Sequence, residues 1–173
     1  MSSRNEVRIN NLRELLGTAL VNAHALEKQS LTSLRSQVEG LDKAPALKTR
    51  VEQYIGETEE QIRRLERSME KNNSQPSTVK DMLLSAHGQI VSLIQTSARD
   101  DVLKTAIAGH GAAAFETASF ASLVALAEDA GDTDIASEMR TCHQTAKAMQ
   151  DWLAERMPEI TREFAEVELS KAS

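Results

Sequence analysis

Two acidic residues occupy positions where the apolar pattern of the chain predicts a core. Glu27 lies between Ala23 and Leu31 on an apolar stripe, and Glu116 lies inside the stretch AAAFETASFASL. A carboxylate in a core costs several kcal/mol unless it is protonated, hydrogen-bonded or bound to a cation. Glu57, in YIGETEEQ, flanks a third stripe. Carboxylates from several helices that meet in a bundle centre form metal sites, so these three acids are the candidate metal ligands.

Nitrogen ligands are scarce in this chain. A dinuclear carboxylate site uses a Glu on each of two helices and an E-x-x-H pair on each of the other two, and no E-x-x-H occurs here. His24 pairs with Glu27 as H-x-x-E, so His24 and His110 are only secondary candidates. A core acid is also explained by pairing with an Arg or a Tyr at a helix end or an interface. Both explanations stay open.

Other kinds of chemistry lack their sequence signals. The chain has no glycine-rich phosphate loop, no paired cysteines at zinc spacing and no nucleophile elbow. Its one cysteine, Cys142, excludes an internal disulfide and suits a reducing compartment, where we expect it to be a small buried helix residue. The stretch IAGHGAAA around His110 is small, which favours close helix packing over ligand binding.

Charge and hydropathy limit the partners and the location of the protein. The net charge is -6, and the 20 Lys and Arg are interleaved with acids, which disfavours nucleic-acid binding. The segment MSSRNEVRINN has no apolar core of a signal peptide, and no run of about 18 apolar residues occurs. We therefore expect a soluble, cytoplasmic protein that neither spans nor binds a membrane.

The elements that must position these acids are helices. Hydrophobic residues make up 40% of the 173 residues but aromatic residues only 3%, so the core consists mainly of aliphatic helix formers. Seven Gly and three Pro are too few for the frequent turns of an all-β domain. Apolar residues at steps of three and four predict long helices over residues 7–38, 46–71 and 100–130, and over 133 to at least 157.

Connections decide how these helices are arranged in one domain, residues 1–173. Short turns make two antiparallel hairpins, and a shorter helix after the loop KNNSQPS lies in the long connection between them. Pro158 kinks or interrupts the last helix, and residues 1–5 and 168–173 are frayed. The prediction is an all-α, ferritin-like four-helix bundle with an additional crossover helix. A helical repeat would need a repeating period, which is absent.

Three stretches together resemble the YciE/YciF-like family of bacterial ferritin-like proteins: HALEKQ, ETEEQIRRL and FETASFASLVALAEDAG. The resemblance implies a ferritin-like bundle, usually dimeric and associated with stress, with a central iron site and no well-established reaction. It assigns Glu27, Glu57 and Glu116 to the family's glutamates on the first three long helices. Several other ligand positions are occupied differently in this chain, by Tyr54, Ala113, Ala114, Thr145 and Ala146, with a one-residue offset open in the last helix.

Three functional hypotheses follow. The leading one is a YciF-type protein whose dinuclear site has degenerated and which acts as a structural or binding protein, stress-associated and homodimeric, with its acids held by Tyr54, Gln61 or a Lys. The alternative is a metal-dependent oxidase or iron-handling protein that binds iron or another divalent metal at a reduced site of Glu27, Glu57 and Glu116. A third reading is an adaptor that binds a partner helix through the Ala-rich third helix. The sequence leaves enzymatic activity undecided and assigns no cofactor.

Overall fold

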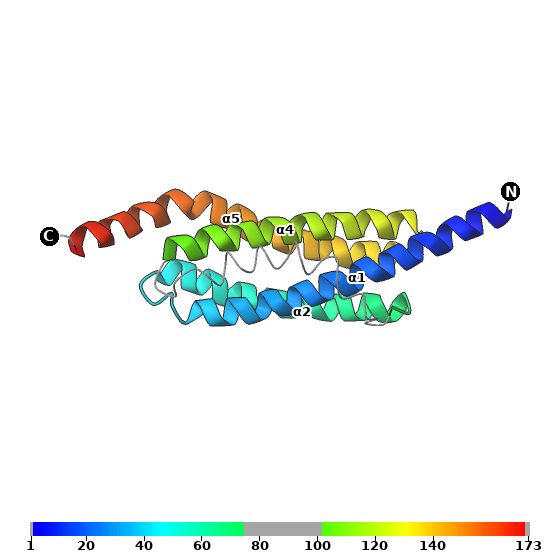
Figure 1. The fold of residues 1–173 in the computed structure, drawn as a ribbon, viewed down its shortest axis with the longest axis horizontal. Coiled ribbons are helices and arrows are strands. Elements are labelled where there is room, and N and C mark those ends of the chain that lie inside the picture. Colours follow the sequence, from blue (N-terminus) through cyan, green and yellow to red (C-terminus); the bar gives the residue numbers. More distant parts are fainter. Residues whose placement is uncertain (1, 75–101, 172–173) are drawn as a thin grey trace.

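The protein is helical throughout the part described by the computed structural model, residues 2–74 and 102–171 (Figure 1). Its helices are α1 (Ser2–Val38), α2 (Pro45–Lys71), α4 (Val102–Asp129) and α5 (Thr133–Lys171). No strand occurs in these residues, so the all-α prediction is confirmed for them. The predicted crossover helix falls on residues that lie outside the described ranges. None of the described helices has an uncharged apolar stretch long enough to cross a membrane.

Local chemistry explains where the helices begin and end. Pro45 opens α2, where its fixed φ fits the first turn and its missing N–H is not needed. Gly131, with φ of +78°, ends α4 in the left-handed region that glycine adopts without strain. The Asp132 carboxylate then accepts a hydrogen bond from the Ile135 backbone N–H at 3.1 Å and caps α5. Both hairpin turns are therefore short and well defined.

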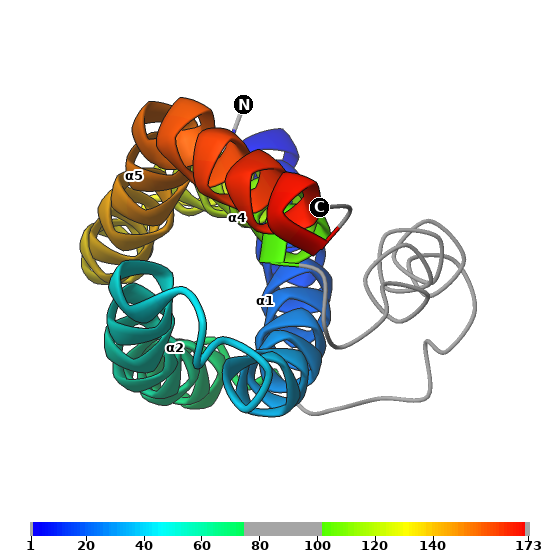
Figure 2. The same cartoon turned by 90° about the vertical axis from the view of Figure 1, so that its left-hand side faces the viewer.

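The four long helices surround a common interior. α1 packs on α2 and α4, and α5 packs on α4 and α2, so α1 and α5 lie diagonally opposite each other (Figure 2). α2 and α4 run in the same direction along the bundle, whereas α1 and α5 run the other way (Figure 1). The chain must therefore cross the length of the bundle between α2 and α4.

Apolar side chains fill the interior in two clusters. The first includes Leu16, Leu65 and Phe120, and the second includes Leu47, Tyr54 and Leu153. The predicted stripe residues in both clusters are largely buried, because side chains three and four positions apart on a helix face the same interior. The acidic residue of α1 falls between the two clusters in sequence.

The end of α5 differs from the sequence prediction. The helix is continuous through Pro158 to Lys171, so of the predicted kink or interruption the interruption is wrong. Proline removes only one backbone hydrogen bond, and Ile160, just after it, is 6% exposed against the second cluster. Figure 1 shows the orange and red part of α5 turning away from the direction of its start. The helical ranges also include most residues of the segments expected to fray.

Candidate functional site

A layer of buried polar side chains lies between the two apolar clusters. Glu27 comes from α1, Thr58 and Gln61 from α2, and Glu116 from α4, and none of the four is more than 2% exposed. Each occupies a position on the inward stripe of its helix, one or two turns from aliphatic core residues. The helical periodicity therefore places these polar groups in the interior, where each needs a hydrogen-bond partner.

Glu116 has two partners from neighbouring helices. The Ser30 hydroxyl donates to Glu116 Oε1 at 2.6 Å, and the Tyr54 hydroxyl donates to Glu116 Oε2. Burial raises the pKa of Glu116, whereas these two hydrogen bonds favour the carboxylate and act in the opposite direction. Glu116 is thus a fixed hydrogen-bond acceptor that ties α4 to α1 and α2.

Glu27 has no such support. Neither of its carboxylate oxygens accepts a hydrogen bond from any described residue, although its side chain is fully buried. Burial holds the pKa of Glu27 well above its ordinary value, and the nearby negative charge of Glu116 raises it further. Of the two neighbouring acids, Glu27 is therefore the one that more readily keeps its proton.

Tyr54 supplies the donor of this site rather than a reactive group. Burial raises the pKa of Tyr54 well above its usual value, and the charges of Glu116 and Glu27 act in the same direction. The phenol consequently stays neutral and keeps the proton that it donates. The guanidinium of Arg50 lies 5.5 Å from the centre of its ring, which adds a cation–π contact on the outer side.

Glu57 faces the same arginine and not the other two acids. Arg50 Nη2 and Nη1 lie 3.1 and 3.3 Å from the two Glu57 oxygens, a bidentate pair, and the Glu57 side chain is 38% exposed. The structure thus brings Glu27 and Glu116 together in the interior and engages Glu57 at its rim. The spacing of Glu57 showed that it flanks the stripe, but not that Arg50, two turns earlier, would hold it.

The secondary histidine candidates lie apart from this pair. His24 Nε2 is 3.1 Å from Glu66 Oε1, whose side chain is 50% exposed, so His24 contacts α2 near the surface. His110 is half-buried on α4. No group of three or more His, Cys, Asp and Glu that could hold a metal ion occurs within the described residues.

Two polar residues of the layer were not recognised as site residues from the sequence. Gln61 was expected to hold a retained acid, but its Nε2 donates to the Cys142 carbonyl at 3.2 Å. Its Oε1 and the Thr58 hydroxyl, like Glu27, have no hydrogen-bond partner in the described part of the chain. Their signal in the sequence was a polar residue at a stripe position, which is weak because threonine and glutamine are common on helices.

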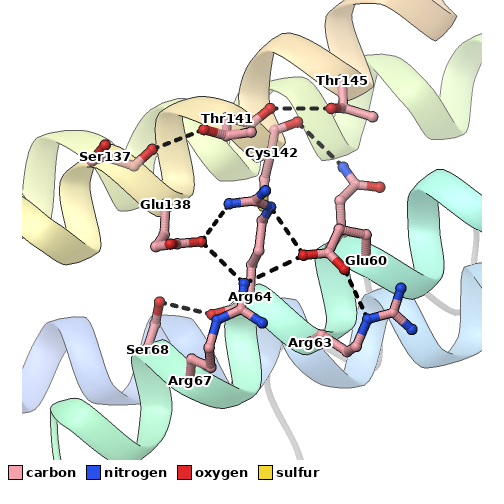
Figure 3. A network of polar contacts seen from close by, with 11 residues as sticks. Glu60, Arg63, Arg64, Arg67, Ser68, Ser137, Glu138, Thr141, Cys142 and Thr145 are labelled. Atoms are coloured by element: carbon pink, nitrogen blue, oxygen red, sulfur yellow. Dashed lines mark hydrogen bonds and ion pairs between the residues drawn. The ribbon is translucent and has the colours of Figure 1, made fainter.

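Beside the layer, α2 and α5 are joined by surface ion pairs. Figure 3 shows Arg64 between Glu138, at 2.6 Å, and Glu60, at 3.5 Å. The hydrogen bond from Gln61 to the Cys142 carbonyl joins the same two helices. Burial raises the pKa of the Cys142 thiol to about 12, so this cysteine is an unreactive thiol at neutral pH. These contacts hold the two helices together and do not add a reactive group.

Comparison with known proteins places the chain among others of undefined role. The family described as a domain of unknown function (DUF892) matches residues 11–166, which include all the residues of the polar layer. The chain belongs to this family. The match runs from α1 through most of α5, so the DUF892 domain accounts for the whole bundle.

Solved structures similar to this DUF892 chain share its fold. A protein from Xanthomonas campestris pv. campestris is 26% identical, with a TM-score of 0.77 over 91% of this chain and 99% of its own. The E. coli stress protein YciF is 19% identical, with a TM-score of 0.73 over 87% of this chain and 97% of its own. YcfI from Rhodopseudomonas palustris is 22% identical, with a TM-score of 0.69 over 83% and 92%. The resemblance to the YciF-like family is thereby confirmed.

The donor set of this DUF892 chain does not fit the dinuclear iron centre that the resemblance implies. Two irons need several bridging carboxylates together with nitrogen ligands. The buried layer offers two carboxylates, one neutral phenol, a hydroxyl and an amide, with no imidazole among its described members. At the positions where the resemblance implies further ligands, Ala113 and Ala146 are 1% and 0% exposed and supply only methyl groups.

Proposed function

We propose that this protein is a ferritin-like, YciF-type bundle that acts as a structural or binding protein, with an interior carboxylate site that no longer supports redox catalysis. The observation that carries the proposal is the state of the two buried acids. Glu116 is engaged by Ser30 and Tyr54, and two of the expected ligand positions, on α4 and α5, hold the buried alanines Ala113 and Ala146. What the layer retains is a hydrogen-bonded link between three helices.

Connectivity supports the ferritin-like part of the proposal. Two hairpins, α1–α2 and α4–α5, are joined by one connection that crosses the bundle, because α2 and α4 run in the same direction (Figure 1). A single long crossover distinguishes ferritin-like bundles from simple up-down-up-down bundles. The crossover helix, a cytoplasmic location, a homodimer and a stress-associated role, the last by analogy with YciF, are further parts of this proposal.

In this proposal the interior acids do not bind a metal. Burial raises the pKa of both acids, and the charge of Glu116 raises that of Glu27 further, so the interior disfavours the ionisation of both at once. The hydrogen bonds from Ser30 and Tyr54 to Glu116 constrain the register of three helices, and a carboxyl group carries no redox chemistry of its own.

One observation favours the alternative, an iron-handling protein. Both oxygens of Glu27 lack a partner among the described residues, and such unpaired buried oxygens are also what a bound cation would satisfy. A reduced site of Glu27 and Glu116 is the form that this second candidate takes.

Metal content separates the two candidates. Untagged protein is measured by inductively coupled plasma mass spectrometry and then titrated with ferrous iron under argon and in air. The expected result is no stoichiometric metal and no oxygen consumption above that of the Glu27→Gln variant. One or more irons per chain, lost in that variant, would establish the iron-handling candidate and overturn the leading one.

A further inference from the structure

Four hydrogen-bonding atoms of the polar layer are buried without a partner in the described part of the chain. They are both carboxyl oxygens of Glu27, the hydroxyl of Thr58 and the Oε1 atom of Gln61. Each of these side chains is at most 2% exposed. Roughly nine in ten or more of the buried polar groups in native proteins have a hydrogen-bond partner. Four such atoms in one layer therefore point to a common partner that does not come from the described helices.

Two of these side chains belong to one row along α2. Tyr54, Thr58 and Gln61 follow one another at steps of four and three positions, so they share the inward face of the helix, and all three are buried. At one end of this row, the Tyr54 hydroxyl donates to Glu116 on α4. At the other end, the Gln61 amide donates to the Cys142 carbonyl on α5. Thr58 therefore lies in the middle of a row whose two ends are attached to neighbouring helices.

Glu27 faces the middle of this row from α1, which packs on α2. Burial and the charge of Glu116 raise the pKa of Tyr54, and the charge of Glu27 raises it further. Burial raises the pKa of the Cys142 thiol, and the charge of Glu27 is the next cause. Tyr54 is one end of the row and Cys142 lies at the other, so the Glu27 carboxyl is within electrostatic reach of both ends. Even so, the Thr58 hydroxyl is not within hydrogen-bond distance of this carboxyl.

The nearby inward positions of α4 and α5 carry short apolar side chains. Ala113 precedes Glu116 by about one turn, and Ala146 follows Cys142 by about one turn; both alanines are buried. A methyl group supplies no hydrogen bond, so neither alanine can serve the unpartnered atoms. It also occupies less of the interior than a leucine or a methionine would, which suits a small ligand at the level of the polar layer.

The chemistry of the unpartnered atoms indicates which small ligand this is. Gln61 Oε1 only accepts hydrogen bonds, the Thr58 hydroxyl donates and accepts, and a protonated Glu27 carboxyl does both. A ligand that serves all of them must itself donate and accept, and it must tolerate a neutral carboxyl group. Water meets both conditions, and a buried water typically makes about three hydrogen bonds to polar groups that have no other partner. A cation would instead require Glu27 to give up the proton that burial favours.

We propose that the polar layer is a water-binding site, in which a water molecule is held between Glu27, Thr58 and Gln61. This water joins α1 to α2 and, through the Gln61 amide, extends the network to α5. Glu116 already joins α4 to α1 and α2, so the two parts of the layer together link all four long helices. The inference rests on the metal-free interior of the proposed function and names what that interior binds.

Thr58→Val tests the bound water through the sign of its effect on stability. Valine has nearly the shape of threonine but no hydroxyl. Removing a buried hydroxyl that has no partner stabilises a protein, whereas removing one that is bonded to water destabilises it. We expect Thr58→Val to lower Tm by about 2–4 °C at pH 5, where Glu27 keeps its proton. Thr117 donates to the Ala113 carbonyl at 2.7 Å within α4, so Thr117→Val is the control, and its Tm is expected to change little.

A crystal structure of the wild-type protein, soaked with manganese, identifies the ligand directly. We expect an oxygen peak without anomalous signal at about 2.5–3.0 Å from Thr58 Oγ1 and Gln61 Oε1. A manganese peak at this place would overturn both the bound water and the metal-free function proposed above. Direct hydrogen bonds among the side chains of the layer with no water between them, or a Thr58→Val variant at least as stable as the wild type, would overturn the bound water alone.

Discussion

Replacing Glu27 with glutamine is expected to stabilise the protein. Glu27 is fully buried, and no described residue donates to either of its oxygens. Its pKa is raised in the folded state, so the native protein binds more protons than the unfolded chain at pH values above the ordinary glutamate pKa of 4.5. The contribution of Glu27 to stability is therefore fully present in acid and is lost as the pH rises towards the raised pKa.

The size of the effect follows from this linkage. While the native state binds one more proton than the unfolded chain, the free energy of unfolding falls by about 1.4 kcal/mol for each unit by which the pH rises. Glutamine has nearly the same shape and no proton to lose. We expect Glu27→Gln to gain about 2 kcal/mol at pH 7.5, or about 4–8 °C in Tm for a chain of this size, and to gain little at pH 5.

Urea denaturation at four pH values measures this directly, with Glu70→Gln as the matched control. Glu70 is exposed on α2, and its replacement removes the same charge from the chain, so the stability of this variant is expected to follow the pH dependence of the wild type. A Glu27→Gln variant that is less stable than wild type at pH 7.5, with an unchanged pH slope, would refute the reasoning. It would mean that Glu27 is ionised and held by a cation or by another donor.

Two other predictions concern the same interior. Tyr54→Phe removes the hydrogen bond to Glu116, so the free energy of unfolding is expected to fall by about 1–3 kcal/mol. Loss of this bond also raises the pKa of Glu116 further, so the free energy of unfolding is expected to decline more steeply as the pH rises. A variant as stable as the wild type at both low and high pH would contradict the role given to Tyr54. Cys142, which is fully buried and has a pKa of about 12, is expected to react with a disulfide reagent at pH 8 only after unfolding in urea, and a rapid reaction in the native protein would show that the α2–α5 seam opens.

The sequence predicted the helices well because their signal is local. Alternating steps of three and four located α1, α2 and α4 to within a few residues, except at the N-terminus of α1, where apolar residues thin out before Val7. The predicted interruption at Pro158 was wrong. A proline in the sequence signals the loss of one backbone hydrogen bond, but it does not reveal that Ile160, two residues further on, packs against the core and supports the helix.

The candidate site was predictable only where position alone decides the environment. Glu27 and Glu116 are in the middle of their stripes, and both are buried. Glu57 lies at the edge of a stripe, where a long side chain can point into the interior or towards the surface. The ion pair with Arg50, on the same helix, holds it at the rim of the site. Ser30 was not anticipated as a partner of Glu116, since a contact between residues 86 positions apart leaves no trace in a single sequence.

The alanine-rich composition of α4 affects its two faces differently. On the inner face, Ala113 places a methyl group where the family resemblance implies a ligand, which removes coordination chemistry from the bundle. On the outer face, Gly111 and its small neighbours leave a smooth, uncharged surface that a second helix can approach. The inner face can be tested on its own, because Glu27→Gln should change the stability of the bundle and its dependence on pH without altering the surface of α4.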